Sequence, residues 1–444
     1  MGTRRTRKSE ERAERKRRGV ASPTMPIASA HPAWSFGALL LISAFFFRDV
    51  FLHPTEMLWG SDLVRLHTTL KAAQFAAVHD GRFPLWDPTA FAGRSIVGDP
   101  VAGVLNPLAW SFWITSSPVM FGYYLWAYVT LGAIGMWLWM RWLNADPMGS
   151  LLAAIAFAFS GRTAGHLFAG HLELLPGMLC LPWVLWASER LLQRRSVGRA
   201  IVLGGVLCIT ATMGSVQSLY WHMRLLAAYV RIRAWRGGGW GRARSAIALL
   251  VVAAGAFALG GMAWWLPVVR QTLLLSARAG ESGGGYDFAT MASAAPSDLA
   301  RLIWPFAGIR PPVPFASDPE NGFFWESASY PGLVTLALAL ALIVLRPKDG
   351  RTIGFGLAAL LALDLSLGRN TPLYRLAYDV VPGFAMFRAP GRLLFYANLF
   401  LAAMAGFGLG ELLRASPGRR GAVAGVSLIL LAIALTAPAP VRSA

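Results

Sequence analysis

The chain has 444 residues, of which 55% are apolar and only 14% charged, and its formal net charge is +19. Soluble domains carry roughly a quarter charged residues, so this composition excludes an ordinary soluble globular protein and favours a membrane protein. The positive charge does not indicate nucleic-acid binding. The basic residues gather near the N-terminus and in short segments between apolar runs, as the positive-inside rule requires.

The first 30 residues are charged and then rich in Ser, Pro and Ala, which predicts a disordered basic tail over 1–30. Nine Lys or Arg residues lie between Arg4 and Arg18, and this cluster predicts a cytoplasmic N-terminus. We expect the remainder, residues 31–440, to form a single transmembrane domain.

Apolar runs recur along this domain and predict about ten or eleven transmembrane helices. The expected spans are Pro32–Leu52, Val119–Trp142, Gly149–Phe168, Leu172–Leu191, Ala200–Tyr220, Leu219–Val230, Ala246–Val269, Tyr330–Leu345, Ile353–Leu367, Leu393–Leu413 and Ala422–Ala437. The fifth and sixth are poorly separated, and a bent hairpin is the alternative for that pair. The runs are apolar all round, which indicates an all-α polytopic membrane protein.

The loops between these spans fall into two groups. Short basic loops, expected in the cytoplasm, cover Arg190–Arg199, Arg231–Arg244, Arg346–Arg351 and Arg414–Arg420. Longer loops, at about 53–117, 270–329 and 368–392, hold most of the acidic residues and are expected to be structured on the opposite, extracytoplasmic face. Polar chemistry is therefore expected on that face.

The first outer loop offers two acidic candidates. Asp62 follows Gly60 near the membrane surface, where partial desolvation makes a carboxylate a better base, and a solvated loop carboxylate that caps the following helix is the alternative. Asp99 precedes Pro100 and either starts a turn or contributes to chemistry. We take Asp62 and Asp99 as candidate catalytic residues.

The second outer turn contains His166, His171 and Glu173. A metal site is weakly indicated, because helical ligand pairs prefer spacings of three or four residues. Contact of the histidines with a phosphate or a sugar hydroxyl, and simple capping at the membrane interface, are the alternatives. No metal ligands are assigned, no cofactor is identified, and a requirement for a divalent metal stays open.

Four further residues are candidates for substrate binding. Gln217 lies at the outer end of the fifth span and Glu326 directly precedes another span, and each either faces a cavity or makes a structural hydrogen bond. Arg388 and Arg392 stand four residues apart at the mouth of a span. Paired guanidinium groups suit phosphate, and snorkelling to lipid headgroups is the alternative.

Several short motifs share their order with a known family. They are Gly60–Asp62, Phe83–Pro88, Leu105–Pro107, Gly165–His171, Leu181–Trp183, Gly214–Tyr220, Trp265–Pro267, Ser276–Arg278, Trp325–Gly332 and Gly368–Arg392. With them, the chain from about Trp34 to Gly410 resembles the bacterial YfhO-type membrane proteins, which look like members of the GT-C class of membrane glycosyltransferases. The chain is shorter than typical members at its C-terminal end, so we expect reduced acceptor recognition, a short variant or a fragment.

The resemblance implies a GT-C-like fold in a bacterial inner membrane. It implies a glycosyltransferase that moves a sugar from a polyprenyl-phosphate-linked donor to a cell-envelope acceptor hydroxyl on the extracytoplasmic face. Asp62 corresponds to the family's early acidic residue and is the expected general base, with Asp99 or Glu173 as a second acid. Arg388 and Arg392, or His166 and His171, would hold the lipid phosphate. A transporter or flippase of lipid-linked sugars and a non-catalytic scaffold are the alternatives.

Overall fold

The apolar runs form helices in the computed structural model of the protein. It describes residues 32–90, 92–236, 240–275, 285–308 and 324–415. Within these residues the fold is helical except for one antiparallel pair of two-residue strands, β1 (Trp86–Asp87) and β2 (Arg94–Ser95). The predicted all-α class is confirmed. The predicted tail 1–30 and the predicted span 422–437 lie outside the described residues.

Residues 32–117 form one apolar helix followed by a loop of short elements at residues 53–117, for which we keep the predicted name, the first outer loop. The helical elements are α2 (Pro32–Phe46), α3 (Arg48–Leu52), the π-helical η1 (Leu63–His67), α4 (Thr68–His79), η2 (Pro100–Ala102), η3 (Pro107–Trp110) and α5 (Ser111–Ile114). Asp99 and Asn106 begin η2 and η3, each with a side chain that accepts from a backbone N–H two residues on.

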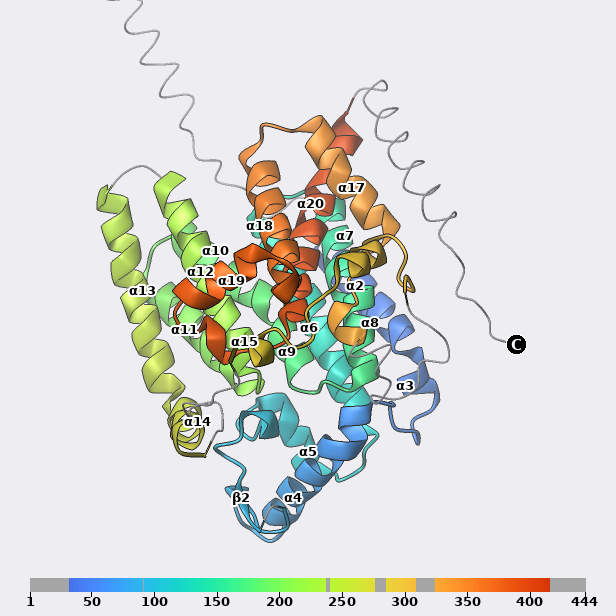
Figure 1. Cartoon of the computed structure of the whole chain (residues 1–444), viewed down its shortest axis with the longest axis vertical. Coiled ribbons are helices and arrows are strands. Elements are labelled where there is room, and N and C mark those ends of the chain that lie inside the picture. Colours follow the sequence, from blue (N-terminus) through green and yellow to red (C-terminus); the bar gives the residue numbers. More distant parts are fainter. Residues whose placement is uncertain (1–31, 91, 237–239, 276–284, 309–323, 416–444) are drawn as a thin grey trace, which may run out of the picture.

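The middle of the chain forms most of the bundle (Figure 1). Its helices are α6 (Met120–Trp142), α7 (Pro147–Ala158), α8 (Gly161–Ala169), α9 (Leu174–Leu179), α10 (Leu181–Gln193), α11 (Val197–Thr212), α12 (Val216–Arg236), α13 (Trp240–Gly260) and α14 (Met262–Leu275). The predicted third span is broken at Ser160, which caps α8, and the fourth at Cys180, ahead of Pro182. The fifth and sixth are the hairpin of α11 and α12.

The C-terminal part completes the bundle. Its elements are α15 (Gly285–Ala289), η4 (Pro296–Leu302), α16 (Phe324–Ser327), α17 (Leu333–Leu345), α18 (Gly350–Ser366), η5 (Gly368–Asn370), α19 (Pro372–Val380), η6 (Phe384–Met386), η7 (Pro390–Leu393) and α20 (Leu394–Arg414). Helix α20 packs against α7, α17 and α18, and most of its side chains are buried. It forms the core of this half of the molecule.

By length and composition, two described helical stretches, Pro147–Ala169 and Pro390–Arg414, can cross a membrane. The bent pair Ser245–Gly260 and Met262–Thr272 makes a third if it counts as one span. Its 75° bend follows a Gly–Gly pair, a common site of helix kinks. Large apolar side chains such as Leu41 and Leu259 are exposed on outer helix surfaces, as contact with lipid requires. The total of ten or eleven spans stays a prediction.

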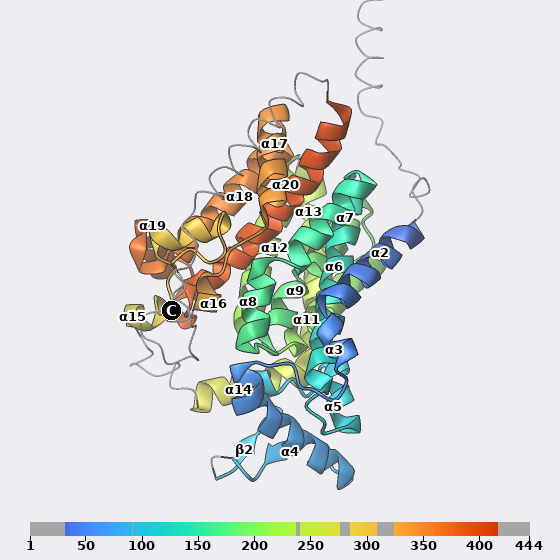
Figure 2. The ribbon, with the colours of Figure 1, turned by 90° about the vertical axis from the view of Figure 1, so that its right-hand side faces the viewer.

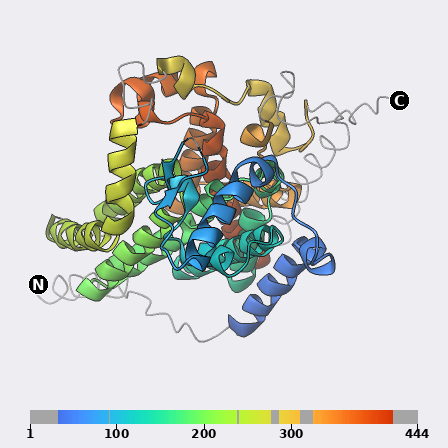
Figure 3. The ribbon, with the colours of Figure 1, turned by 90° about the horizontal axis from the view of Figure 1, so that it is seen from below.

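The predicted basic loops and the first predicted outer loop lie at opposite ends of the bundle. The adjoining ends of α12 and α13, the α17–α18 connection and the end of α20 lie at the top of Figure 1, whereas α4, α5 and strand β2 lie at the bottom. Arg195 bonds Ser245, which brings the α10–α11 loop to the same end as the start of α13. Figure 2 shows the same separation, and Figure 3 shows the blue outer-loop segments across the opposite end. The side of the membrane on which each end lies stays a prediction.

Candidate functional site

Two glycines attach the first outer loop to the turn between α8 and α9. Gly170 ends α8 with a φ of +81°, and a Cβ on Gly60 would lie 2.6 Å from the Gly170 Cα atom. The Ser61 hydroxyl donates to the Ala169 carbonyl oxygen at 3.3 Å. This contact sets the next residue, Asp62, beside the histidines of the turn.

Replacing Gly60 by alanine is expected to destabilise the protein by about 1–3 kcal/mol, because the new Cβ would overlap backbone atoms that have no rotamer to relieve the clash. Thermal unfolding in lipid nanodiscs measures the effect. The control is Gly205→Ala in α11, where a Cβ would meet nothing within 4 Å and no loss is expected. Equal melting temperatures of the two variants would contradict the close contact between Gly60 and Gly170.

Asp62 and the two histidines form a chain of polar groups. The Asp62 Oδ2 atom lies 3.6 Å from His171 Nε2, and His171 Nδ1 lies 2.6 Å from His166 Nδ1. The Asp62 side chain is 44% exposed, whereas that of His171 is 8% exposed, with its ring against the edge of Trp325. The carboxylate is thus the open end of a chain that runs into the protein.

The environment of Asp62 makes it a stronger base than an ordinary aspartate. Burial raises the pKa of its carboxyl, and the nearby Glu173 charge acts in the same direction, whereas His171, His67 and the Arg392 guanidinium act against them. A carboxylate whose pKa is raised holds a proton more readily than an ordinary one. It is therefore suited to accept a proton from a hydroxyl.

Glu326 lies at the centre of a buried ion-pair network behind the histidines. Its carboxylate accepts from Arg392 Nε and Nη2 at 3.0 and 2.9 Å, and Arg392 Nη1 donates to Gln217 Oε1 at 2.8 Å. Arg162 Nη2 lies 3.7 Å from Glu326 Oε2, while its Nη1 donates to the Trp325 and Glu326 carbonyl oxygens. Burial alone would raise the pKa of Glu326, but the charge and hydrogen bonds of Arg392, together with the nearby His171 and Arg162, outweigh burial and lower the pKa, so the carboxyl stays ionised.

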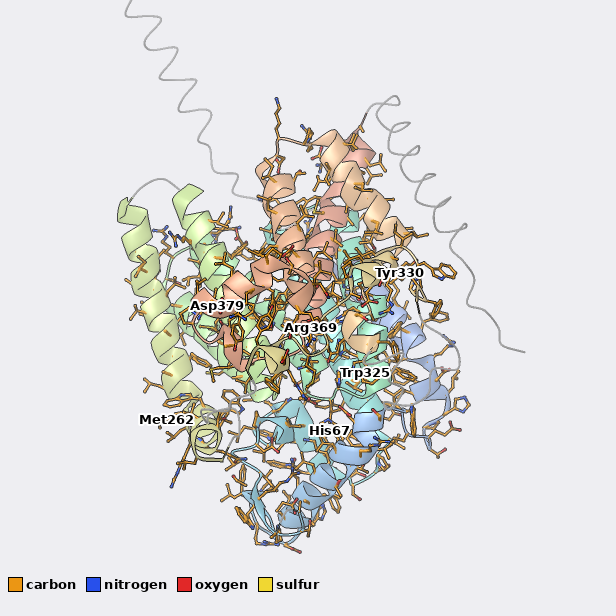
Figure 4. The ribbon with its side chains drawn as sticks, viewed as in Figure 1. His67, Met262, Trp325, Tyr330, Arg369 and Asp379 are labelled. Atoms are coloured by element: carbon orange, nitrogen blue, oxygen red, sulfur yellow. The ribbon has the colours of Figure 1, made fainter. Side chains whose placement is uncertain are left out.

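A further ion pair, which was not predicted from the sequence, joins the first outer loop to the bundle. His67, in the π-helical turn after Asp62, is fully buried, and its Nε2 atom lies 3.1 Å from Glu173 Oε2. Figure 4 shows His67 on the outer loop beneath Trp325, at the junction with the bundle. Single-turn π-helices often occur at functional sites. The available signal was the spacing of His67 and Lys71, four residues apart and so on one face of a helix.

Lys71 continues this buried face of the outer loop. Its Nζ donates to the Ala102 carbonyl oxygen at 2.6 Å, and Gln74 donates to the same oxygen at 2.8 Å. Burial lowers the pKa of Lys71 from 10.5 to about 7, despite the attraction of Glu173 and Asp99. The Lys71 ammonium is therefore present only in part at neutral pH.

Protein stability is expected to rise between pH 7 and pH 9 through Lys71. In that range the unfolded chain holds a proton on this lysine that the folded protein has largely lost, so raising the pH favours the folded state. In Lys71→Met this rise should be reduced. Unfolding midpoints at both pH values measure it, with the exposed Lys348→Met as control. An identical pH dependence in wild type and Lys71→Met would rule out a depressed lysine pKa.

Asp99 approaches the site from the far end of the same loop. Its side chain accepts from the Val101 N–H at 3.0 Å and lies 3.5 Å from Arg94 Nη1. Burial raises the pKa of Asp99, with Glu173 adding to the increase. Gly214, with a φ of +93°, allows the approach, since a Cβ there would lie 2.4 Å from the Pro100 carbonyl oxygen and 3.0 Å from Glu173 Cβ. Asp99 therefore starts a turn, which was one of its two predicted roles, and its carboxylate lies near Glu173.

The structure thus brings most of the predicted site residues to one end of the bundle. Asp62 lies 3.6 Å from His171, Glu173 and Arg392 act on the pKa of Asp62, and Glu173 also acts on that of Asp99. Arg388 is separate from this group. Its guanidinium is exposed and lies against Met291 Sδ at 3.6 Å and the Phe288 ring, while its carbonyl oxygen accepts from Gln217. Among the described residues, no group of three or more His, Cys, Asp or Glu side chains is arranged to hold a metal ion.

Comparison with known proteins gives a similarity of structure only. No family model matches the chain, and no curated protein matches it. It is similar to crystal structures of the Archaeoglobus fulgidus oligosaccharyltransferase, one tethered to an acceptor peptide (TM-score 0.40, 14% identity) and one in the apo form (TM-score 0.39, 15% identity). These cover 92% and 91% of this chain but 56% and 55% of the other, so the chain spans little more than half of that protein.

Proposed function

We propose that the protein is a membrane glycosyltransferase of the GT-C type, which moves a sugar from a polyprenyl-phosphate-linked donor to an acceptor hydroxyl. The observation that carries the proposal is the half-exposed Asp62 carboxylate of raised pKa, held between an outer loop and the end of an apolar bundle. A lipid-linked donor reaches such a place from the bilayer and an acceptor from the aqueous side. We propose an extracytoplasmic site in a bacterial inner membrane, with a cell-envelope acceptor.

In this proposal Asp62 is the general base. It accepts the proton of the acceptor hydroxyl as that oxygen attacks the anomeric carbon, and the bond between this carbon and the phosphate oxygen breaks with its electron pair going to phosphate. The step is a single displacement and inverts the anomeric configuration. Asp99 is the second acidic residue, and its charge adds to the electrostatic field around Glu173.

Arg388 and Arg392 have different roles in this proposal. Arg392 is held by Glu326 and Gln217, so most of its donors are engaged within the protein. Arg388 is exposed, and no carboxylate among the described residues pairs with it. We therefore assign Arg388 to the donor phosphate, where a positive charge stabilises the leaving group, and Arg392 to the support of the site.

A transporter of lipid-linked sugars would require ionisable groups within the spans. Asp364, within the predicted span Ile353–Leu367, is the candidate for that role. Asp364 lies in the last turn of α18, where its two carboxylate oxygens accept from the Thr371 hydroxyl at 3.0 and 2.9 Å. This local contact at a helix end accounts for Asp364 without a transport pathway, and it favours the enzyme over the transporter.

The test combines chemistry with transport. Purified protein in vesicles receives undecaprenyl-phosphate- and dolichyl-phosphate-linked mannose, glucose and N-acetylglucosamine, together with envelope extracts as acceptors. The proposal expects a glycosylated product of inverted anomeric configuration, determined by NMR, and free polyprenyl phosphate. Movement of intact donor between leaflets without cleavage would instead establish a transporter, and a product of retained configuration would exclude the single displacement.

A further inference from the structure

The contact between His166 and His171 limits where their protons can lie. Their Nδ1 atoms are 2.6 Å apart. Two lone pairs, or two N–H groups, would repel at this distance, so one proton lies between the rings and belongs to one of them. The pair is therefore a single hydrogen-bonded unit rather than two independent ligands for a substrate.

The surroundings keep the two rings neutral. Burial lowers the pKa of His171, and the charge of Arg392 lowers it further, against the opposing effects of Glu326, Glu173 and Asp62. His166 is buried, and the positive charges near it are those of Arg162 and Arg392. Two neutral imidazoles carry two N–H groups between them. One lies between the rings, and the other is on the Nε2 atom of either His171 or His166.

The charge of Asp62 selects between these two arrangements. An ionised carboxylate only accepts hydrogen bonds, so the His171 Nε2 atom that faces it is favoured in its N–H form. His171 Nδ1 must then accept, and His166 Nδ1 must donate to it. The separation of 3.6 Å between Asp62 and His171 is long for a hydrogen bond, as is common at catalytic sites before substrate binds.

We propose that His166 and His171 are positioning residues that hold Asp62 ionised and oriented for catalysis, with His166 fixing the tautomer that points the His171 Nε2–H at the carboxylate. The catalytic role of this arrangement rests on the proposed function. Once Asp62 has taken a proton from the acceptor, its carboxyl faces an N–H group rather than a lone pair. The new proton is therefore weakly held and leaves through the exposed side of Asp62 to water, which restores the carboxylate for the next turnover.

The test measures the Asp62 proton directly, without a substrate. Protein labelled with ¹³C at the aspartate side-chain carboxyls is titrated by NMR in nanodiscs, and the Asp62 signal is assigned from its loss in Asp62→Asn. His171→Ala removes the donor and is expected to raise the Asp62 midpoint by about one pH unit, the size of one charge-assisted hydrogen bond. His171→Gln, whose amide returns a donor, should restore most of the wild-type midpoint. His166→Leu should shift it upward by less.

Two controls keep the result decisive. The exposed His79→Gln should leave the Asp62 midpoint unchanged. In the wild-type protein, ¹⁵N shifts should report His171 protonated at Nε2 and His166 protonated at Nδ1, which needs no variant to fold. The opposite tautomers, or an unchanged midpoint in folded His171→Ala, would overturn the inference. Unchanged sugar transfer by Asp62→Asn would instead remove the proposed function, and the NMR result would still decide the role of the histidine pair.

Discussion

Replacing Glu326 by glutamine is expected to lower the free energy of unfolding by about 3–5 kcal/mol, the typical cost of removing one partner of a buried ion pair. Glu326 is 5% exposed and Arg392 is 19% exposed, so water cannot take the place of the lost charge. The loss leaves the guanidinium groups of Arg392 and Arg162 without the carboxylate that they share. Urea or thermal unfolding in mixed micelles measures the difference.

The matched control is the exposed pair of Arg346 and Glu411. The Arg346 Nε atom lies 2.8 Å from Glu411 Oε2, a shorter distance than most in the buried network, but the Arg346 side chain is 56% exposed. Glu411→Gln is therefore expected to cost at most about 1 kcal/mol. Equal losses in Glu326→Gln and Glu411→Gln would show that burial does not set the value of the Glu326 network.

Replacing Asp62 by asparagine is expected to lower sugar transfer by about 10²–10⁴-fold, the usual contribution of a general base. The amide has nearly the shape of the carboxylate but cannot accept the hydroxyl proton. In the wild type, turnover should fall with decreasing pH at a higher value than an ordinary aspartate would give, because burial raises the pKa of Asp62 and the ionised form is the active one. A rate profile from pH 4 to pH 8 measures this limb.

Asp80→Asn is the control for Asp62→Asn, since Asp80 lies in the same outer loop, pairs with Arg82 and is 62% exposed. Its turnover and pH profile should match those of the wild type. An acid limb at the ordinary aspartate pKa in the wild type would contradict the raised pKa of Asp62, even if Asp62→Asn were inactive.

The helical fold followed from the sequence because lipid imposes a strong and local rule. A run apolar on all sides must be helical to satisfy its backbone, and the runs around α6, α17 and α20 show this without reference to partners. The breaks at Ser160 and Cys180 were missed. They depend on a capping hydroxyl and on Pro182, which interrupt helices without lowering the apolar content of the segments.

The site could be predicted from the sequence only in part, because it depends on contacts between loops that are distant in the chain. Asp62, His171 and Glu326 were each singled out because a polar group beside a span is unusual. Their partners were not predicted, because the contact of Gly60 with Gly170 and the pairing of Glu326 with Arg392 join residues far apart in the chain. His67 was missed for the same reason, as its partner Glu173 lies in the distant turn between α8 and α9.

The most direct test is sugar release by purified protein in lipid nanodiscs from a radiolabelled panel of polyprenyl-phosphate sugars, with wild type and Asp62→Asn compared at equal folding. We expect wild type to release the sugar of at least one donor to an acceptor, and Asp62→Asn to lose that release. Equal release by both proteins, or none by the folded wild type with any donor, would contradict a glycosyltransferase that uses Asp62 as its base.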